Sequence, residues 1–460
     1  LGFPFKSQRL EEIEKLKMRF FEEVDHDRKA KLNEQILVML GECLAGSKRS
    51  LGYEVNFDFA VFFSEVFTSK GGFDVVIANP PYINSRSMAK ADAEMRELIQ
   101  ASYTLTKGSW DIYIAFFEKG FRLLNKSGVL AYITPDKWIS KPFGDALRIQ
   151  TTPRIFSILK AGREVFESVN VDAIVSIYVS REEPCLRIYD YAGTQLRLKN
   201  TVQKSSLKSP YAYDWLFSDY GDLLLNLDTH SHKLSELAVC ENSCATDDAY
   251  RLRKLIEEDT EAGNDGQHLT MINTGTIAKY VSRWGKREMV YLGSRYLRPV
   301  VNRKRFLQDF PKSYGQKSIR KKLILKGLNL LDACLDADGT VIPGIPTLVI
   351  CSDELETLKL LLGIVNSALP FFYIKEKYPA ASYNQGTTFT KEMFNDLPLP
   401  DIDEKDRAKL ISVVDQILAA KRRNYGADTT ALEAEIDRLV YAMYGLTTAE
   451  VGTVERIARK

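Results

Sequence analysis

Two consecutive prolines directly after a short apolar run place the strongest constraint on this chain. Residues Phe73 to Ala78 are rich in apolar and β-branched side chains, which predicts a buried parallel strand. Pro80 and Pro81 each fix φ and lack an N–H, and Pro80 also keeps Asn79 out of the helical region. The strand therefore ends in a stiff, extended turn. Because ligands bind at the carboxyl ends of strands in open α/β sheets, we expect a site at this turn.

The chemistry that this turn offers is narrow. Asn79 supplies a carboxamide oxygen as an acceptor and cannot act as a general base. Tyr82 supplies a flat ring for stacking. Acceptors beside an aromatic plate suit a flat substrate that presents an NH2 group, such as the exocyclic amine of a nucleobase. The residues alone leave a second interpretation, in which the turn is only a proline-stiffened loop.

The run from Asn79 to Tyr82 resembles the Asn-Pro-Pro-Tyr motif of DNA amino-methyltransferases, which methylate adenine with S-adenosylmethionine. A helix beginning near Asp111 and a strand ending at Thr134-Pro135 follow in the order seen in TaqI-like and type IIG restriction-modification enzymes. The resemblance covers residues 55 to 180 and implies N6 methylation of an adenine that has been flipped out of duplex DNA.

The resemblance also implies roles for individual residues. Asn79 and Pro80 would accept hydrogen bonds from the target amine, and Tyr82 is the third catalytic residue. Phe166 would stack on the flipped base opposite Tyr82. By the same resemblance, the residues that flank the cofactor's adenine are Pro81 and Phe116.

One expected element is missing from the sequence. Enzymes of this kind carry a glycine-containing cofactor loop upstream of the Asn-Pro-Pro-Tyr motif, and this chain has no Gly-x-Gly sequence. No convincing nuclease motif is present either. We therefore expect the chain to be the C-terminal part of a larger protein, with the missing N-terminal part of the same polypeptide as its partner.

A basic, aromatic-rich stretch runs from Lys279 to Lys326. Clustered positive charge with interleaved aromatic rings is typical of proteins that bind a phosphate backbone, although such a run is often only a solvated face. Beside a base-modifying motif, it indicates binding to double-stranded DNA. The candidate contacts are Arg283, Lys286, Arg287, Arg295, Arg303, Lys304, Arg305, Arg320, Lys321 and Lys322.

The chain is expected to fold as an α/β protein, with a partial Rossmann-like methyltransferase domain, a mixed α+β target-recognition domain and C-terminal helices. Its length of 460 residues is more than one core normally holds. The expected segments are a helical segment (1–52), the methyltransferase catalytic region (53–200), the target-recognition domain (201–400) and a helical hairpin (401–460).

Local patterns within these segments predict further elements. Residues 83–91 are expected to form a loop and residues 194–209 a linker, and the apolar run from Leu355 to Phe372 predicts one helix. The pattern at residues 8–43 fits either two helices or one long bent helix.

Global composition narrows the class of protein without naming a partner. Lys and Arg number 63 against 61 Asp and Glu, so net charge does not indicate what the chain binds. No apolar run is long enough to span a membrane, and the six cysteines lack the spacing of a zinc site. We expect a cytoplasmic protein with reduced cysteines and no metal. The alternative function is a DNA-binding specificity module without catalytic activity of its own, and methylation of RNA or protein is a third interpretation.

Overall fold

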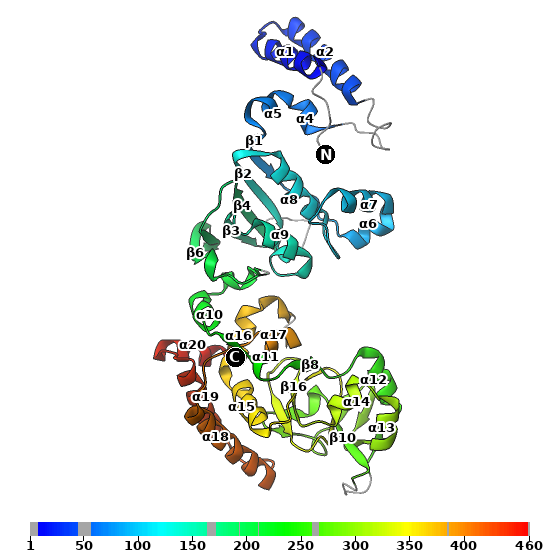
Figure 1. The fold of residues 1–460 in the computed structure, drawn as a ribbon, viewed down its shortest axis with the longest axis vertical. Coiled ribbons are helices and arrows are strands. Elements are labelled where there is room, and N and C mark those ends of the chain that lie inside the picture. The colour runs from blue at the N-terminus through cyan, green and yellow to red at the C-terminus, as the bar shows by residue number, and fades with distance from the viewer. Residues whose placement is uncertain are drawn as a thin grey trace. The chain divides into compact units, whose positions relative to one another are not determined.

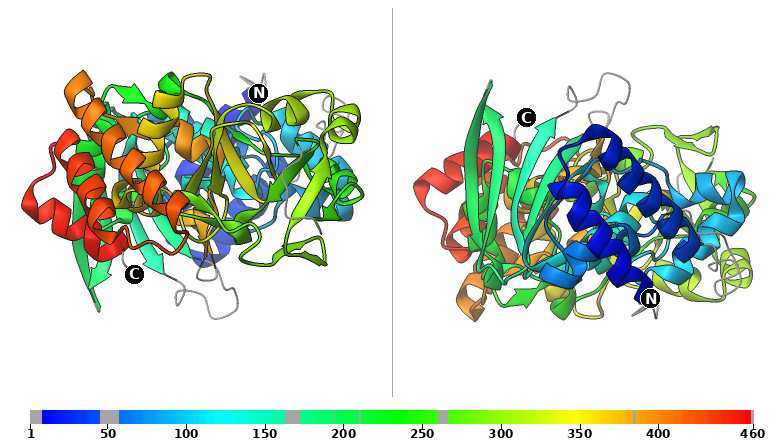
Figure 2. Two further views of the ribbon diagram at one scale, coloured as in Figure 1. Left: turned by 90° about the horizontal axis from the view of Figure 1, so that it is seen from below. Right: turned by 90° about the horizontal axis from the view of Figure 1, so that it is seen from above.

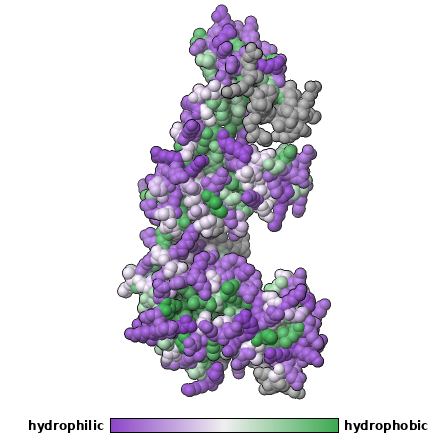
Figure 3. All heavy atoms as spheres, viewed as in Figure 1, coloured by the Kyte–Doolittle hydropathy of each residue, from purple (hydrophilic) through white to green (hydrophobic). Residues whose placement is uncertain are grey.

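The structure of this chain is a computed structural model. It describes residues 8–44, 57–162, 172–192, 194–209, 211–259, 266–383 and 386–458. The chain divides into two compact units, Leu1–Tyr213 and Asp214–Lys460, which are described separately (Figure 1). Hydrophilic residues make up most of the described surface seen in Figure 3.

The first unit is a sheet with helices before and between its strands (Figure 1). Its helices are α1 Gln8–Glu22, α2 His26–Leu44, α4 Phe59–Phe62, α5 Ser64–Lys70, α6 Ser85–Ala91, α7 Ala93–Ser102, α8 Ile112–Leu123 and α9 Asp145–Thr151. Its strands are β1 Phe73–Ala78, β2 Leu124–Pro135, β3 Ile155–Gly162, β4 Ala173–Val179, β5 Cys185–Ala192 and β6 Gln195–Gln203.

These strands form one six-stranded sheet in the order β1-β2-β4-β3-β5-β6. The expected β–α–β unit is confirmed, because β1 and β2 run parallel and α8 lies between them in the sequence. The rest of the sheet is mixed: β4 is antiparallel to β2 and β3, and β3 is parallel to β5. Strand β1 is at one edge of this sheet, so the Asn-Pro-Pro-Tyr turn leaves from an edge strand.

One face of the sheet is packed by aromatic side chains from α8 and the segment after β2. Phe117 on α8 contacts the rings of Tyr132 and Trp138, and all three side chains are buried. Gly120 on α8 lies so close to Leu130 and Tyr132 that a Cβ atom there would collide with both side chains. A residue without a side chain is therefore required where α8 crosses β2.

The segment before the sheet is helical, as expected, and consists of two helices. α1 and α2 lie side by side (Figure 2, right) and bury Ile13, Ile36 and Leu40 between them. Lys17 on α1 is itself buried and pairs with Glu65 on α5 at 2.7 Å. This ion pair joins the helical pair to the helix that leads into β1.

Two local predictions for the first unit were wrong. The expected loop at residues 83–91 contains α6, which begins after Asn84 because the Asn84 side chain accepts a hydrogen bond from the Ser87 N–H at 2.9 Å. The expected linker at residues 194–209 contains β6, which pairs antiparallel with β5 over residues 195–203.

The second unit contains short strands and helices (Figure 1). Its helices are α10 Gly221–Asp228, α11 Leu234–Leu237, α12 Thr246–Arg253, α13 Arg303–Asp309, α14 Ser313–Ser318, α15 Leu355–Asn366, α16 Ala368–Lys377, α17 Lys391–Asn395, α18 Glu404–Arg423, α19 Thr430–Met443 and α20 Thr448–Ala458. Its strands are β7 His232–Lys233, β8 Cys240–Asn242, β9 Glu257–Glu258, β10 His268–Ile272, β11 Ile277–Ala278, β12 Val281–Ser282, β13 Met289–Tyr291, β14 Ser294–Tyr296, β15 Pro299–Asn302, β16 Lys322–Lys326, β17 Ala333–Asp336, β18 Val341–Pro343, β19 Thr347–Cys351, β20 Ser382–Tyr383, β21 Gly386–Thr387 and β22 Pro398–Leu399.

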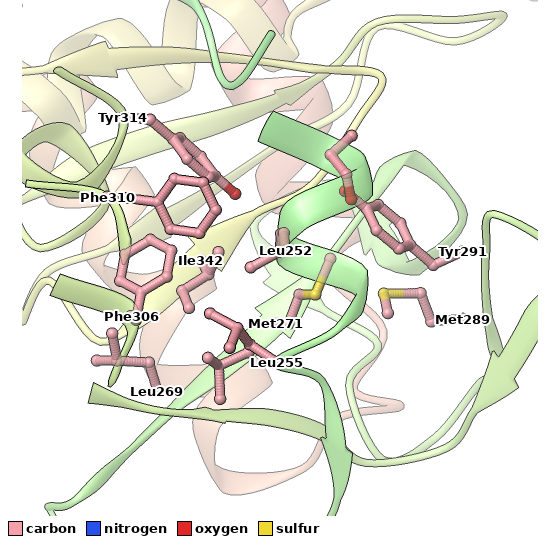
Figure 4. Close-up of a cluster of buried hydrophobic side chains, with 12 residues drawn as sticks. Leu252, Leu255, Leu269, Met271, Met289, Tyr291, Phe306, Phe310, Tyr314 and Ile342 are labelled. Atoms are coloured by element: carbon pink, nitrogen blue, oxygen red, sulfur yellow. The ribbon is translucent and has the colours of Figure 1, made fainter. Parts of the chain in front are cut away.

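Two four-stranded sheets organise this unit, in the orders β17-β16-β19-β8 and β18-β10-β15-β9. Beside the second sheet, the rings of Phe306, Phe310 and Tyr314 pack against one another in a buried cluster that also includes Leu269 and Ile342 (Figure 4). This core holds α13 and α14, which carry part of the basic stretch, against the strands.

The expected single helix over Leu355 to Phe372 is two helices, α15 and α16, bent by 63° at Ser367. Asn366 at the end of α15 bonds the backbone of Ala333 twice, accepting from its N–H at 2.8 Å and donating to its carbonyl at 3.0 Å. The Ala368 N–H at the start of α16 donates to Asp437 at 2.8 Å. These side-chain bonds to the backbone fix the bend, which helical periodicity does not reveal.

The C-terminal segment has one more helix than the expected hairpin, because α20 follows α18 and α19. In the part of the chain that the structure describes, no single helix is long and apolar enough to cross a membrane, and only the bent α15–α16 pair passes that test of length and composition. All six cysteines are free thiols. The described residues contain no cluster of potential metal ligands.

Candidate functional site

The Asn79–Tyr82 turn leaves the carboxyl end of β1, where Ala78 pairs with Tyr132 of β2. Asn79 and Pro81 are exposed, whereas Pro80 is buried and Tyr82 is half-buried. The buried proline anchors the turn while its neighbours on both sides point outward. The structure therefore presents the Asn79 side chain at the surface, at the sheet edge where the prolines predict a ligand site.

The Asn79 and Tyr82 side chains are joined directly. The Tyr82 hydroxyl donates a hydrogen bond to Asn79 Oδ1 at 2.9 Å. Partial burial raises the pKa of Tyr82 above its ordinary value, so the phenol keeps its proton and remains a donor. A carboxamide oxygen has two lone pairs, so Asn79 Oδ1 can still accept one further hydrogen bond from a ligand.

Backbone hydrogen bonds hold the residues that follow Tyr82 against the start of α8. The Ser85 N–H donates to the Trp110 carbonyl at 2.8 Å, and the Ile112 N–H donates to the Ile83 carbonyl at 2.9 Å. Trp110 is completely buried. The turn is thus fixed at its proline end by burial and at its far end by these two bonds.

Two carboxyl groups lie in this region, one at each neighbouring element. Burial raises the pKa of Asp111, which precedes α8, and the pKa of Asp136, which follows β2. Burial also raises the pKa of Tyr113 strongly, and its electrostatic neighbours include Asp111, Asp136 and Tyr82. Asp111, Asp136 and Tyr82 are thus all electrostatic neighbours of the buried Tyr113 side chain. Sequence analysis did not single out Asp136, because its neighbours Tyr113 and Asp172 are far from it along the chain.

The candidate cofactor residues come from two different elements. Pro81 is exposed on the turn, and Phe116 on α8 has 37% of its surface exposed. The Phe116 carbonyl accepts a hydrogen bond from Tyr132 at 3.1 Å, which ties this part of α8 to the sheet. Both residues thus offer apolar surface from fixed backbone positions. Phe166, the expected second stacking residue, lies outside the described residues.

The candidate DNA-binding residues come from several parts of the second unit. Arg283, Lys286 and Arg287 lie between β12 and β13, Arg295 is on β14, Arg303, Lys304 and Arg305 begin α13, and Arg320, Lys321 and Lys322 lie at the start of β16. Lys286, Arg287, Lys304 and Lys321 are exposed, and they form no ion pair with any of the described residues.

Other members of this group are already paired. Arg295 contacts Glu288 at 3.2 Å, Arg305 contacts Glu257 at 3.3 Å, and Arg320 contacts Asp353 at 3.1 Å. These pairs are exposed, and water screens them, so a phosphate group can replace the carboxylate at small cost. Arg283 and Arg303 are half-buried.

Lys322 is a correction to the predicted DNA contacts. Its side chain is fully buried, and its ammonium group is paired with Asp336 and donates to the Ser318 carbonyl at 2.6 Å. Lys322 therefore faces the interior of the β16–β17 sheet and cannot reach a phosphate from this position. Sequence analysis did not predict the burial of Lys322, because its partner carboxylate, Asp336, lies on the next strand, β17.

Comparison with known proteins relates part of the chain to DNA methyltransferases of restriction-modification systems. Residues 6–166 match the family model of Eco57I restriction-modification methylases. The chain is 36% identical over 80 residues to the type II methyltransferase M.PaeR7I of Pseudomonas aeruginosa, covering 17% of this chain and 13% of that protein. It is 30% identical over 76 residues to the type II restriction enzyme and methyltransferase RM.Eco57I of Escherichia coli, covering 16% of this chain and 8% of that protein.

Among solved structures, the type IIL restriction-modification enzyme MmeI in complex with DNA is similar, with a TM-score of 0.46 and 12% identity. That similarity covers 92% of this chain and 63% of the MmeI chain. The chain spans only a small part of the length of the two curated relatives, M.PaeR7I and RM.Eco57I. The expected resemblance to restriction-modification methylases is confirmed for residues 6–166.

Proposed function

We propose that this chain is the C-terminal part of a type II restriction-modification enzyme that methylates adenine at N6 in a specific duplex DNA sequence. The observation that carries the proposal is the Asn79–Tyr82 pair, which sits on a proline-fixed turn at the carboxyl end of β1. The match of residues 6–166 to the Eco57I methylase family supports it.

The residues of the turn would bind and orient the amine that accepts the methyl group. The target adenine leaves the base stack to reach a protein site of this kind. Asn79 Oδ1 and the Pro80 carbonyl accept the two hydrogens of the exocyclic amine, which aims its nitrogen lone pair away from them. No strong base is needed, because the amine can lose its proton after attack. The contribution of these residues is position and charge placement.

The aromatic residues would hold the flipped base between two faces. Tyr82 is half-buried and tethered through its hydroxyl, so its ring has one defined orientation. A base stacked on such a ring gains about 1–3 kcal/mol. Phe166 is proposed as the opposing ring on the strength of the family resemblance.

S-adenosylmethionine is the proposed cofactor, and it supplies a methyl group bound to a positively charged sulfur. The residues present fit one side of this molecule: Pro81 and Phe116 offer exposed apolar surface for its adenine ring. The chain has no Gly-x-Gly sequence through which the backbone could approach a cofactor closely. We therefore propose that the remaining side of the cofactor site comes from another part of the intact protein.

The second unit would bind the DNA backbone and position the target. Exposed lysines and arginines without a carboxylate partner, such as Lys286 and Lys304, are suited to phosphate contacts. This assignment makes the basic stretch a recognition region, and it predicts strong dependence of binding on salt concentration.

Transfer of a tritiated methyl group tests the proposal. The intact protein is incubated with duplex DNA and labelled S-adenosylmethionine, and the DNA is digested to nucleosides. We expect label in N6-methyl-2′-deoxyadenosine. We expect the Asn79→Ala variant to lose about 100-fold or more of the rate while its affinity for duplex DNA stays within about twofold. Label in cytosine, or full activity of Asn79→Ala, would overturn the proposal.

A second candidate function is favoured by the missing glycine loop. The chain would then be a specificity module that binds DNA and supplies half of an active site to a partner. Titration calorimetry with S-adenosylmethionine separates the two. Salt-dependent binding of duplex DNA without any cofactor binding by the intact protein would support the module.

A further inference from the structure

We propose that Asp136 is a specificity residue of the candidate site, whose carboxyl group donates a hydrogen bond to a ring nitrogen of the flipped adenine. Asp136 directly follows β2, beside the turn that carries Asn79 and Pro80. Those two residues would accept from the amine of the base, and Asp136 would supply the matching donor. The proposal deepens the proposed function and rests on it for the identity of the base.

The register of the sheet brings Asp136 beside the Asn79–Tyr82 turn. Strands β1 and β2 run parallel, with Ala78 next to Tyr132. Four residues further along each chain lie Tyr82 and Asp136. Both strands thus leave the sheet at the same carboxyl edge, where ligands of open α/β sheets bind. Asp136 is half-buried, so part of its side chain stays accessible to a ligand at this edge.

Asp136 lies on the face of the sheet that α8 covers. Tyr132 and Thr134, at alternate positions of β2, are buried, and Tyr132 contacts α8. Asp136 continues this alternation. Tyr113 on α8 is fully buried, and both Asp136 and Tyr82 are among its electrostatic neighbours. Asp136 and Tyr82 therefore approach the same buried side chain from two adjacent strands.

A second carboxyl group, that of Asp172, is opposite Asp136. The pairing of β2 with β4 matches Pro135 with Ala173, and the Asp136 N–H donates to the Asp172 carbonyl at 2.9 Å, which extends the pairing by one residue. Residues directly opposite each other on antiparallel strands have Cβ atoms about 4.5–5.5 Å apart, and two like charges there repel. A proton on Asp136 removes this repulsion.

The surroundings of Asp136 favour its protonated form. Burial and the neighbouring Asp172 raise the pKa of Asp136 above its ordinary value, although Lys160 on β3 and the adjacent Lys137 act in the opposite direction. A protonated carboxyl group is a hydrogen-bond donor, whereas a carboxylate only accepts. The charged and titratable groups around Asp136 are Asp172, Lys160, Lys137, Asp111 and Tyr113.

A donor is the group that the Asn79–Tyr82 turn itself does not offer. Asn79 Oδ1 and the Pro80 carbonyl are acceptors, and neither proline has an N–H. The Tyr82 hydroxyl already donates to Asn79. Adenine presents a ring nitrogen as an acceptor on each side of its amine, N1 and N7. A ring nitrogen that enters a protein site without a donor loses the hydrogen bond it made to water.

The hydroxyl of Tyr113 is a second sign that a polar group binds in this region. Its oxygen is buried and makes no hydrogen bond of ordinary geometry with the described residues, although Asp111 is close enough to interact with it. Buried hydroxyl groups normally have a partner. The free oxygen of Asp136 would accept from Tyr113 while its protonated oxygen donates to the base, which fixes the orientation of the carboxyl group.

Two substitutions of Asp136 distinguish a donor from a structural carboxylate. Single-turnover methyl transfer to duplex DNA is measured with the intact protein at limiting DNA. Asp136→Ala removes the donor and should lower the rate about fivefold. Asp136→Asn keeps an N–H donor and should stay within about twofold of wild type. Equal losses in the two variants would assign Asp136 a structural role and overturn the proposal.

Glu182→Gln is the matched control. Glu182 is an exposed carboxylate in the connection between β4 and β5, which begins at the end of β4 that is remote from Asp172. The rate of this variant should equal that of wild type. A fall as large as that of Asp136→Ala would show a general effect of lost negative charge and contradict the proposal.

Modified bases identify the nitrogen that accepts the bond, and they need no foldable variant to do so. The target adenine is replaced by 7-deazaadenine or by 1-deazaadenine. The wild-type protein should lose about fivefold on one of these analogues, and Asp136→Ala should lose nothing further on that analogue, because the bond is already absent. Full activity of the wild type on both analogues would overturn the proposal.

The pH dependence gives a result that a structural role would not produce. The bond requires protonated Asp136, so the wild-type rate at limiting DNA should fall as pH rises through the pKa of Asp136. The amide of Asp136→Asn donates at every pH, and this variant should lack that fall. Identical pH profiles of the wild type and Asp136→Asn would contradict the proposal.

Carbon-13 NMR of the aspartate carboxyl groups in residues 1–460 separates this proposal from the proposed function. Asp136→Asn assigns the signal. We expect a titration midpoint above the ordinary value of 3.8. A midpoint at or below that value would overturn the proposal even in a protein that methylates adenine. Absence of label in N6-methyl-2′-deoxyadenosine would instead overturn the proposed function, and with it the identity of the base.

Discussion

The hydroxyl of Tyr82 donates to Asn79 Oδ1 at 2.9 Å, across the two prolines that separate these residues. The bond fixes the rotamer of the carboxamide, because a rotation about χ2 would replace the oxygen with an NH2 group that cannot accept. It also leaves the oxygen with one free lone pair. The Asn79 acceptor is therefore oriented before a substrate binds. The two prolines make the turn rigid and keep the Asn79 and Tyr82 side chains within hydrogen-bonding distance.

The first prediction concerns this hydroxyl. In the active protein, Tyr82→Phe keeps the ring and removes the donor, which is worth about 1 kcal/mol. We expect the single-turnover methyl transfer rate to fall about fivefold, with little change in DNA affinity. Tyr82→Ala removes the ring as well and should cost much more. Equal rates for the wild type and both variants would show that Tyr82 does not contact the base.

The second prediction concerns the basic stretch. Lys286→Ala and Lys304→Ala each remove an exposed charge that has no carboxylate partner among the described residues. Each change should lower the slope of log affinity against log salt by about one, because one fewer counterion is released. The matched control is Lys405→Ala, an exposed lysine on α18. A slope that changes equally in all three variants would contradict a localised DNA-binding surface.

The third prediction concerns the buried ion pair. Lys322→Met leaves the Asp336 carboxylate buried without its cation, which typically costs about 3–5 kcal/mol in the free energy of unfolding. The double variant with Asp336→Asn should lose less. Lys321→Met changes the exposed neighbour and should stay within about 0.5 kcal/mol of wild type. Urea unfolding measures all three, and similar losses at both lysines would argue against the pair.

The fourth prediction concerns Asp437, which accepts the Ala368 N–H at the bend between α15 and α16. Burial raises the pKa of Asp437 above its ordinary value of 3.8. At a pH between the ordinary pKa of an aspartate and the raised pKa of Asp437, the folded state binds more protons than the unfolded state. The free energy of unfolding from this group therefore falls as pH rises through that interval, and the loss persists at higher pH.

Asp437→Asn keeps the acceptor oxygen and removes the charge. We expect the variant to be at least as stable as wild type at neutral pH and to show a smaller loss of stability between about pH 4 and pH 7. Urea midpoints across that range measure the difference. A variant that is less stable than wild type at neutral pH would show that the carboxylate charge itself holds α16.

The sequence predicted the parts of the fold that depend on local rules. Pro80 and Pro81 end β1, and β1 and β2 form the expected parallel pair. It failed where distant residues decide the structure. Residues 195–203 become β6 because β5 provides a partner strand, and Lys322 is buried because Asp336 on β17 neutralises it.

The candidate site was predictable to a similar degree. The residue types of the Asn79–Tyr82 turn follow from the sequence, and the structure adds the bond between them. Asp136 was not predicted, because its burial beside Tyr113 depends on how β2 and α8 pack. The exposure of β1 was not predicted either. Val75 and Ile77 belong to an apolar run that predicts an interior strand in the sequence, whether or not a neighbouring element covers them.

The hydrogen bonds and the ion pair of Asp336 determine where recognition segments can be joined when they are exchanged between related proteins. Asp336 binds Lys322, and it also accepts the N–H groups of Thr340 at 3.1 Å and Val341 at 3.0 Å. The Lys322 ammonium group also donates a hydrogen bond to the Ser318 carbonyl. A chimaera joined between Lys322 and Asp336 would separate this buried pair, so that a parent lacking the matching charge leaves the other charge unpaired in the interior. An exchange that moves residues 318–341 as one piece keeps both charges paired. The recipient protein can then fold with the new recognition segment.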